Sequence, residues 1–247
     1  MPLFFRFITI VERISLRRAR VVTGESNFTV QFLAENFPGP KIHQVEHAPS
    51  VVFRQVARRP QIAPIQFLSV GTLELRKGTD MLFAALDQLR ASMDFRLKVI
   101  APPSPRYMES LRGSVSAQTW ERIEFKHHLL PHEVAAELAT PTMLLMPTRA
   151  DTGPVAVKEA VVAGVPVVGA AVGGIPDYVV HGKNGLLFPA GDLEAFIQSI
   201  QSACAHPLFG HGQVNPETLA MQREYLSPEL MAKKFLAVYE TVIALGR

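Results

Sequence analysis

Two acidic side chains lie close together in a stretch of the chain that is otherwise almost uncharged. Asp151 and Glu159 are eight positions apart in the segment TRADTGPVAVKEAVVAGVPVV, residues 148–168. Apolar residues surround Glu159 and predict a helix with much of its surface buried, where a carboxylate without a partner costs free energy. Glu159 therefore either points to solvent or accepts hydrogen bonds from a hydroxylated ligand.

The helix that carries Glu159 is expected to begin at Pro154 and to end at Gly164. One of the three residues before it is expected to cap its first turn: Asp151, Thr152 or Gly153. The amides of about residues 153–156 then point outward and form an anion site that needs no side chain. The same few residues thus bring together a carboxylate and a helix N-terminus.

A basic pair, Arg76 and Lys77, lies in a second loop, GTLELRKG, residues 71–78. The pair stands at the start of an expected helix, where two cations and the positive end of the helix dipole could converge on a diphosphate. The alternative is a solvated basic pair. The loop has neither the Gly-x-Gly-x-x-Gly spacing nor a Walker A sequence, which disfavours a nicotinamide, flavin or P-loop nucleotide site.

Alternating apolar strands and amphipathic helices would position these two loops. The strands are expected at 66–71, 95–101, 122–129, 142–148, 165–171 and 185–190. The helices are expected at 79–90, 106–117, 131–139, 154–164 and 192–203. Strands that are apolar on both faces predict an α/β fold with a doubly wound parallel sheet. Ligands bind beyond the carboxyl ends of such strands, so the loops that follow strands should form the site.

Composition limits the class of protein. The chain of 247 residues is 48% hydrophobic and 19% charged, which suits a packed core and not a disordered chain. Cys204 is the only cysteine, so a disulfide framework and a thiolate zinc cluster are both excluded. A reducing compartment, the cytoplasm, is the expected location. The net charge is +3, and residues 1–60 hold nine Lys or Arg against four Glu.

The first twenty residues are apolar and basic. Arg6 and Glu12 interrupt the apolar run before it reaches the length of a membrane-spanning helix, and no signal-peptide cleavage site follows it. Residues 1–20 could instead lie in an anionic lipid interface as a peripheral contact. The alternative is a helix that packs against protein.

Residues 147–192 resemble the donor-site signature of the retaining glycosyltransferases with the two-domain GT-B fold, known as group 1 or family 4. The two acids are followed in order by Gly-Val-Pro-Val-Val, Gly-Gly-Ile-Pro, Asn-Gly-Leu-Leu and Gly-Asp, without a gap. VGTLELRKG resembles that family's first strand and phosphate loop, and residues 227–243 resemble its last helix. The resemblance covers the chain from about residue 12 to the end and implies the Rossmann-like C-terminal half of a GT-B fold.

The resemblance also implies roles for the charged residues. Glu159 would accept hydrogen bonds from the ribose and Asp151 would hold hydroxyls of the transferred sugar, although the family usually has Glu at that position. Arg76 and Lys77 would stabilise the charge on the departing diphosphate. Further donor contacts would come from Gly71, Thr72, Leu129, Leu130, Gly153, Pro154, Val155 and Gly174.

The implied donor is a UDP- or GDP-linked sugar, and no other cofactor is expected. No divalent metal is expected either, because the sequence has no Asp-x-Asp and the basic pair would stabilise the diphosphate charge in place of a metal ion. The nucleotide base would lie against the loop HHLLP, residues 127–131. No nucleic-acid partner is expected.

Three domains are implied. Residues 1–60 would be a remnant of the N-terminal acceptor domain and a linker, 61–225 the nucleotide-sugar domain, and 226–247 a helix that packs back toward the N-terminal part. The expected function is transfer of a sugar, with retention, to a saccharide or lipid acceptor, with a partner chain supplying the missing domain. Such an enzyme would be cytoplasmic or peripheral at the inner face of the membrane. The alternatives are an inactive nucleotide-sugar-binding fragment and, less favoured, a nucleotide-sugar epimerase.

Overall fold

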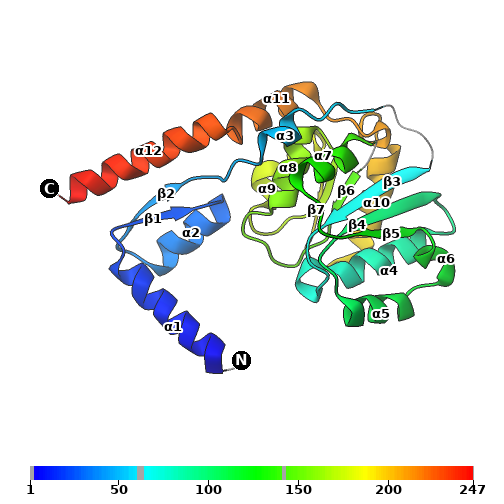
Figure 1. Ribbon diagram of the computed structural model, residues 1–247, viewed down its shortest axis with the longest axis horizontal. Helices are drawn as coiled ribbons and strands as arrows, with labels where there is room; N and C mark the ends of the chain where they lie inside the picture. The colour runs from blue at the N-terminus through cyan, green and yellow to red at the C-terminus, as the bar shows by residue number, and fades with distance from the viewer. Residues whose placement is uncertain (1–2, 60–63, 141–142, 247) are drawn as a thin grey trace.

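The larger part of the molecule is a six-stranded parallel sheet. The computed structural model describes residues 3–59, 64–140 and 143–246 (Figure 1). The strands are β3 (Ile65–Val70), β4 (Phe95–Ile100), β5 (Ile123–Lys126), β6 (Met143–Met146), β7 (Val167–Ala170) and β8 (Gly185–Phe188). Their order is β5-β4-β3-β6-β7-β8, and every neighbouring pair is parallel. The predicted doubly wound α/β fold is confirmed.

Helices cover both faces of this sheet, as Figure 1 shows for α4 and α5 on one side and α7 and α8 on the other. One core contains α4 (Thr79–Leu89), α5 (Pro105–Gly113) and α10 (Leu193–Ala205). The other core contains α3 (Val51–Arg54), α7 (Pro131–Ala139), α8 (Val155–Ala163) and α9 (Ile175–Tyr178). Consecutive strand residues alternate between the cores: Phe67 belongs to the first and Leu68 to the second.

Two local predictions are wrong. The helix expected at 106–117 is two helices, because α5 ends at Gly113 and Ser116 caps a new helix, α6 (Ala117–Trp120), by accepting a hydrogen bond from the Thr119 amide. No side chain of residues 151–153 caps α8. Pro154 occupies the N-cap position without a side-chain hydrogen bond, so the preceding loop is held by other contacts.

The strand order creates a crevice between two loops. The chain runs from β3 outward through β4 to β5, then crosses back to β6 beside β3 and runs outward through β7 to β8. The loops that leave β3 and β6 therefore turn to opposite sides, and a gap opens between them beyond the strand ends. These are the loops that carry Arg76, Lys77 and Asp151.

A smaller part precedes the sheet. Helix α1 (Leu3–Arg18) leads into β1 (Val21–Gly24), α2 (Asn27–Asn36) and β2 (Lys41–Gln44), and β1 pairs with β2 in parallel. The sequence analysis described residues 1–60 only as a domain remnant and a linker. It did not indicate β2, because Lys-Ile-His-Gln has no apolar run.

The last helix returns to this smaller part, as Figure 1 shows. After η2 (Phe209–His211) and α11 (Pro216–Tyr225), α12 (Pro228–Leu245) runs back toward β1. Lys234 on α12 forms an ion pair with the buried Glu46, and Arg20 donates a hydrogen bond of 2.8 Å to the Leu245 carbonyl. The proposed domain boundaries stay a prediction, and the boundary at 60/61 lies outside the described residues.

Within the described residues, no helix combines the length and the apolar character that a bilayer crossing requires. Helix α1 carries exposed apolar side chains on several turns: Phe7, Ile8, Ile10, Val11 and Ile14. Of the 1–20 segment proposed for lipid contact, residues 1 and 2 lie outside the described residues.

Candidate functional site

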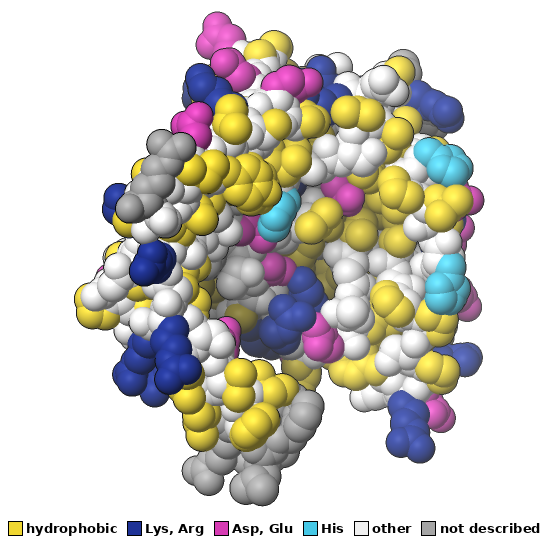
Figure 2. Space-filling view, turned by 60° about the vertical axis from the view of Figure 1, so that its left-hand side comes forward, with side chains coloured by type: hydrophobic (Ala, Val, Ile, Leu, Met, Phe, Trp, Pro, Cys, Tyr) yellow, Lys and Arg dark blue, Asp and Glu magenta, His cyan; other side chains and the backbone are white. Residues whose placement is uncertain are grey.

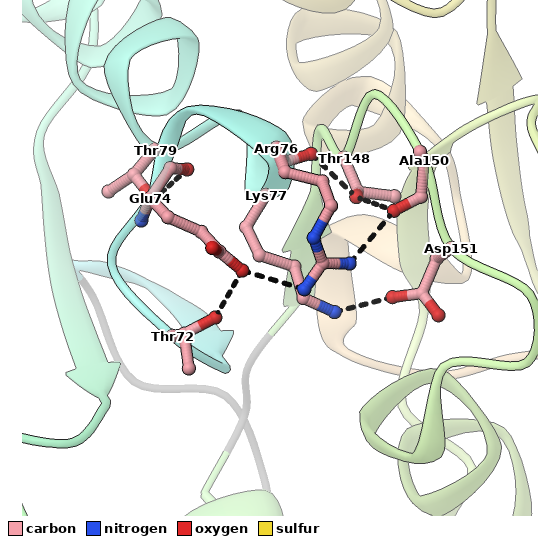
Figure 3. Close-up of polar contacts among 8 residues, drawn as sticks. All are labelled: Thr72, Glu74, Arg76, Lys77, Thr79, Thr148, Ala150 and Asp151. Carbon is pink, nitrogen blue, oxygen red and sulfur yellow. Dashed lines mark hydrogen bonds and ion pairs between the residues drawn. The ribbon is translucent and has the colours of Figure 1, made fainter. Parts of the chain in front are cut away.

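The loops after β3 and β6 meet through charged side chains (Figure 3). Residues Leu75–Lys77 form a 3₁₀ turn, η1, that directs Lys77 toward the β6 loop. The Lys77 Nζ lies 2.5 Å from Asp151 Oδ2 in an ion pair that is largely shielded from solvent. Arg76 donates a hydrogen bond of 3.2 Å to the Ala150 carbonyl, and its own carbonyl accepts one of 2.8 Å from the Arg149 amide. The basic pair and the first acid are thus part of one site.

Glycines bring the strand-end loops into backbone contact. A Cβ at Gly78, whose φ is +69°, would lie 1.9 Å from the Pro147 carbonyl oxygen. A Cβ at Gly173, whose φ is +58°, would lie 1.5 Å from the Asp151 carbonyl oxygen. No other residue type fits at these two positions without moving the loops.

Glu74 neutralises the guanidinium of the basic pair. Arg76 Nη2 donates to Glu74 Oε1 at 2.7 Å, and the Thr72 hydroxyl donates to the same oxygen at 2.7 Å. The hydrogen bond from Thr72 and the positive charge of Arg76 lower the pKa of Glu74. The sequence analysis missed Glu74, because its pairing depends on the 3₁₀ turn and not on a motif.

A cavity of about 350 Å³ lies at the C-terminal edge of β3 and β6. Seven of the predicted site residues line it: Gly71, Lys77, Asp151, Gly153, Pro154, Val155 and Glu159. Figure 2 shows a hollow in this face of the molecule, with Lys and Arg beside Asp and Glu side chains on its floor. The structure therefore brings most of the predicted donor contacts around one space.

Glu159 faces that cavity and a second one of about 370 Å³, which Phe53, His128 and Leu129 also line. Glu159 is half-buried, and no hydrogen bond or ion pair reaches its carboxylate from the part of the chain that the structure describes. Burial raises the pKa of Glu159 to about 7, although the charge of Lys158 acts in the opposite direction. An unpaired carboxylate between two cavities is suited to accept hydrogen bonds from a ligand.

Arg76 of the basic pair and three further predicted donor contacts do not line either cavity. Leu130 precedes α7 as its N-cap residue and is 58% exposed, in contrast to Leu129. Thr72 directs its hydroxyl to Glu74. The Gly174 amide donates to the Asp151 carbonyl at 3.2 Å, so this glycine supports the loop. Their contribution to donor binding stays a prediction.

A buried ion pair beside the site was also missed. Lys158, next to Glu159 on α8, is 1% exposed and pairs with Glu25, which follows β1. Its ammonium lies 5.6 Å from the centre of the Tyr178 ring. Glu25 packs so closely on Gly153 that a Cβ there would lie 2.7 Å from the carboxylate carbon. A lysine inside an apolar helix was the signal that could have revealed this pair.

Comparisons with known proteins match the chain to one family. The family described as glycosyl transferases group 1 matches residues 64–206. The GDP-mannose-dependent alpha-(1-6)-phosphatidylinositol monomannoside mannosyltransferase of Mycolicibacterium smegmatis is 29% identical over 221 residues, covering 80% of this chain and 57% of the relative. The glycogen synthase of Mycobacterium tuberculosis is 26% identical over 151 residues, covering 61% of this chain and 36% of the relative. The chain thus spans about a third to somewhat over half of these relatives.

Solved structures share the fold. Sucrose-phosphate synthase from Thermosynechococcus elongatus superposes with a TM-score of 0.81 at 20% identity, over 96% of this chain and 61% of that one. Alr3699/HepE from Anabaena, solved with UDP and glucose, gives a TM-score of 0.74 at 16% identity, over 95% of this chain and 66% of that one. At such identities the likeness concerns the fold.

Proposed function

The chain belongs to the group 1 glycosyltransferases, and we propose that it binds a nucleoside-diphosphate sugar in the crevice between the β3 and β6 loops. The proposed reaction transfers the sugar, with retention, to a saccharide or lipid acceptor. One observation carries the proposal: Lys77, Asp151 and the unpaired half-buried carboxylate of Glu159 line one cavity at the strand ends.

Glu159 would accept hydrogen bonds from the ribose hydroxyls. The ligand would then supply the partners that the described part of the chain does not, which offsets the cost of the buried carboxylate. The cavity on the side of Leu129 has mainly apolar walls, including Phe53 and Ile100, and would hold the flat base. HepE, bound to UDP, supports a uridine donor, and the mannosyltransferase named above supports a guanosine donor.

Lys77 and Arg76 would bind the diphosphate. In the site as it stands, Lys77 is paired with Asp151, so donor binding would exchange partners: Lys77 would turn to phosphate and Asp151 to hydroxyls of the sugar. During transfer, the bond between the anomeric carbon and the diphosphate oxygen breaks and its electron pair leaves with the diphosphate. The acceptor oxygen bonds to the same carbon and releases its proton to the departing phosphate or to water. The two cations stabilise the leaving charge without a metal ion.

Binding without turnover is the second candidate function. All donor contacts proposed above come from this chain, whereas the relatives are longer than the segment that matches it. In this candidate function, a partner chain that contributes to acceptor binding would turn donor binding into transfer. None of the relatives named above is an epimerase.

We place this activity in the cytoplasm, at the inner face of a membrane if the acceptor is a lipid. The exposed apolar residues of α1, among them Phe7 and Ile14, share the helix with Arg13, Arg17 and Arg18. Such a helix can bind an anionic interface or another protein. Flotation with vesicles distinguishes lipid binding from protein binding. A chain that binds an anionic interface should float with anionic vesicles and not with neutral ones.

Thermal unfolding with nucleotides tests the donor site. UDP or GDP at millimolar concentration should raise the melting temperature of the full chain, and Glu159→Ala should abolish the rise. Glu109→Ala, at an exposed position on α5, is the matched control and should keep it. An unchanged melting curve with every nucleoside diphosphate would overturn the proposal.

A further inference from the structure

A third cavity adjoins the proposed donor site. It has a volume of about 310 Å³ and is lined by Phe28, Arg76, Asp151, Thr152, Val172 and Gly173, among others. Asp151 lines both this cavity and the cavity that holds Glu159. A ligand in the third cavity would therefore lie next to the carboxylate that the proposed function assigns to the transferred sugar.

The charges of this cavity are already balanced. Arg76 is paired with Glu74 at 2.7 Å, and Asp151 is paired with Lys77 at 2.5 Å. The remaining polar groups are neutral, because Thr152 offers an exposed hydroxyl and Gly173 offers only backbone. Before the donor binds, a charged ligand in this cavity would need to displace one of these pairs, whereas an uncharged ligand with several hydroxyls would not.

An aromatic ring completes the cavity from the smaller part of the molecule. Phe28, in the first turn of α2, is 49% exposed although it lines the cavity. The start of α2 is fixed on α9, because the amide and the side chain of Asn27 donate to the two carboxylate oxygens of Asp177 at 2.7 and 2.9 Å. The two hydrogen bonds thus hold the helix start that carries Phe28 next to the strand-end loops.

An exposed aromatic face beside a few hydroxyl-binding groups is the pattern of a sugar site. The apolar face of a pyranose packs on an aromatic ring, and its hydroxyls reach the polar groups at the edge. We propose that this cavity binds the acceptor as an uncharged sugar ring, stacked on Phe28 and hydrogen-bonded to Asp151 and Thr152. This proposal rests on the proposed transferase function, since it takes the neighbouring cavity to hold the donor.

Saturation-transfer NMR on the full chain tests the acceptor cavity directly. The probes are methyl α-glucoside, methyl α-mannoside and methyl β-galactoside, each with and without saturating UDP or GDP. At least one glycoside should bind, and nucleotide should not displace it. Phe28→Ala should lower the affinity for that glycoside about fivefold, which corresponds to the loss of one aromatic contact. It should leave the nucleotide affinity unchanged.

Phe32→Ala is the matched control, because Phe32 lies one turn further on α2, is also 49% exposed and does not line the cavity. It should leave glycoside binding unchanged. Equal glycoside binding by Phe28→Ala and the unaltered chain would overturn the acceptor site, as would displacement by UDP or GDP. Nucleotide binding without any glycoside binding would overturn it too and leave the donor proposal standing. Failure of every nucleotide to bind would instead contradict the proposed function, whatever the glycosides do.

Discussion

Lys77 Nζ lies 2.5 Å from Asp151 Oδ2, and the two side chains are only 20% and 11% exposed. They come from loops that follow different strands, 74 positions apart in the chain. The pair therefore bridges the two loops beyond the ends of β3 and β6. It places two opposite charges on the wall of the cavity there. A ligand that carries both phosphate and hydroxyl groups can satisfy each partner separately, which is the basis of the first prediction.

Lys77→Met should lower the affinity for UDP or GDP much more than the affinity for the corresponding nucleoside. A charge-assisted hydrogen bond contributes about 1.5–3 kcal/mol, so the loss for the diphosphate should be about tenfold or more. Isothermal titration measures both ligands. Lys183→Met, at an exposed position before β8, removes the same charge elsewhere and should change neither affinity. Equal losses for diphosphate and nucleoside would show that Lys77 does not bind phosphate.

Ionisation of Glu159 should lower the free energy of unfolding of the chain as the pH rises. Burial raises the pKa of Glu159 from 4.5 to about 7, so the folded state holds a proton more tightly than the unfolded state. The stabilising contribution is complete below pH 4.5, falls as the pH increases toward about 7, and is lost above that value.

Glu159→Gln should remove this part of the pH dependence. At pH 8 the variant should be more stable than the unaltered chain by roughly 1–2 kcal/mol, a value reduced for the partial exposure of the carboxylate. Urea unfolding at several pH values measures the difference. Glu109→Gln, at an exposed position, should leave the profile as it is. If the stability of the variant depends on pH in the same way as that of the unaltered chain, the loss of stability at high pH does not come from Glu159.

Gly173→Ala should disrupt the site through its Cβ. Both Gly173 and Gly182 have a positive φ, +58° and +76°, but only the Cβ at 173 meets another atom, the Asp151 carbonyl oxygen at 1.5 Å. Gly182→Ala should therefore lose about 1 kcal/mol of stability from the backbone conformation alone. Gly173→Ala should lose about 2 kcal/mol more, together with nucleotide binding, because the β6 loop must move. Similar losses in the two variants would show that the loop tolerates the methyl group.

Lys158→Met should destabilise the contact between α8 and the segment after β1. The change leaves Glu25 partly buried with only His47, at 3.2 Å, beside it, which costs up to about 3 kcal/mol by comparison with other broken buried pairs. Adding Glu25→Gln should recover much of that loss, since the remaining group is uncharged. Denaturant unfolding of the two single variants and the double variant gives the coupling energy, and strictly additive losses would rule out the pair as a stabilising unit.

The sheet and its loops could be predicted because their signals are local. The central strands are the clearest of these signals, because MLLM of β6 and VVGA of β7 are apolar runs that are buried throughout. Parallel strands place their following loops at one edge, so Arg76, Lys77 and Asp151 could be expected to meet before any contact was seen. Lys77 indeed pairs with Asp151, and Arg76 donates a hydrogen bond to the carbonyl of the preceding residue, Ala150.

The remaining features depend on contacts between distant segments. The partner of Lys158 is Glu25, 133 positions earlier, and Phe28 lines its cavity beside Asn27, whose partner Asp177 lies 150 positions later. The expected cap of α8 also failed, because the residues before Pro154 make their contacts with other loops instead of with the helix amides. No local pattern specifies any of these pairings.

The close approach of Gly78 to Pro147 and of Gly173 to Asp151 joins the loops after β3, β6 and β7 through main-chain atoms, in addition to the Lys77–Asp151 pair. Much of the outline of the crevice is consequently set by the backbone and not by the side chains on its rim. Exposed positions on its rim, such as Thr152 and Val155, are free to change in size and polarity while the frame stays in place. A small set of substitutions at the rim should therefore be enough to redirect the chain from one sugar to another.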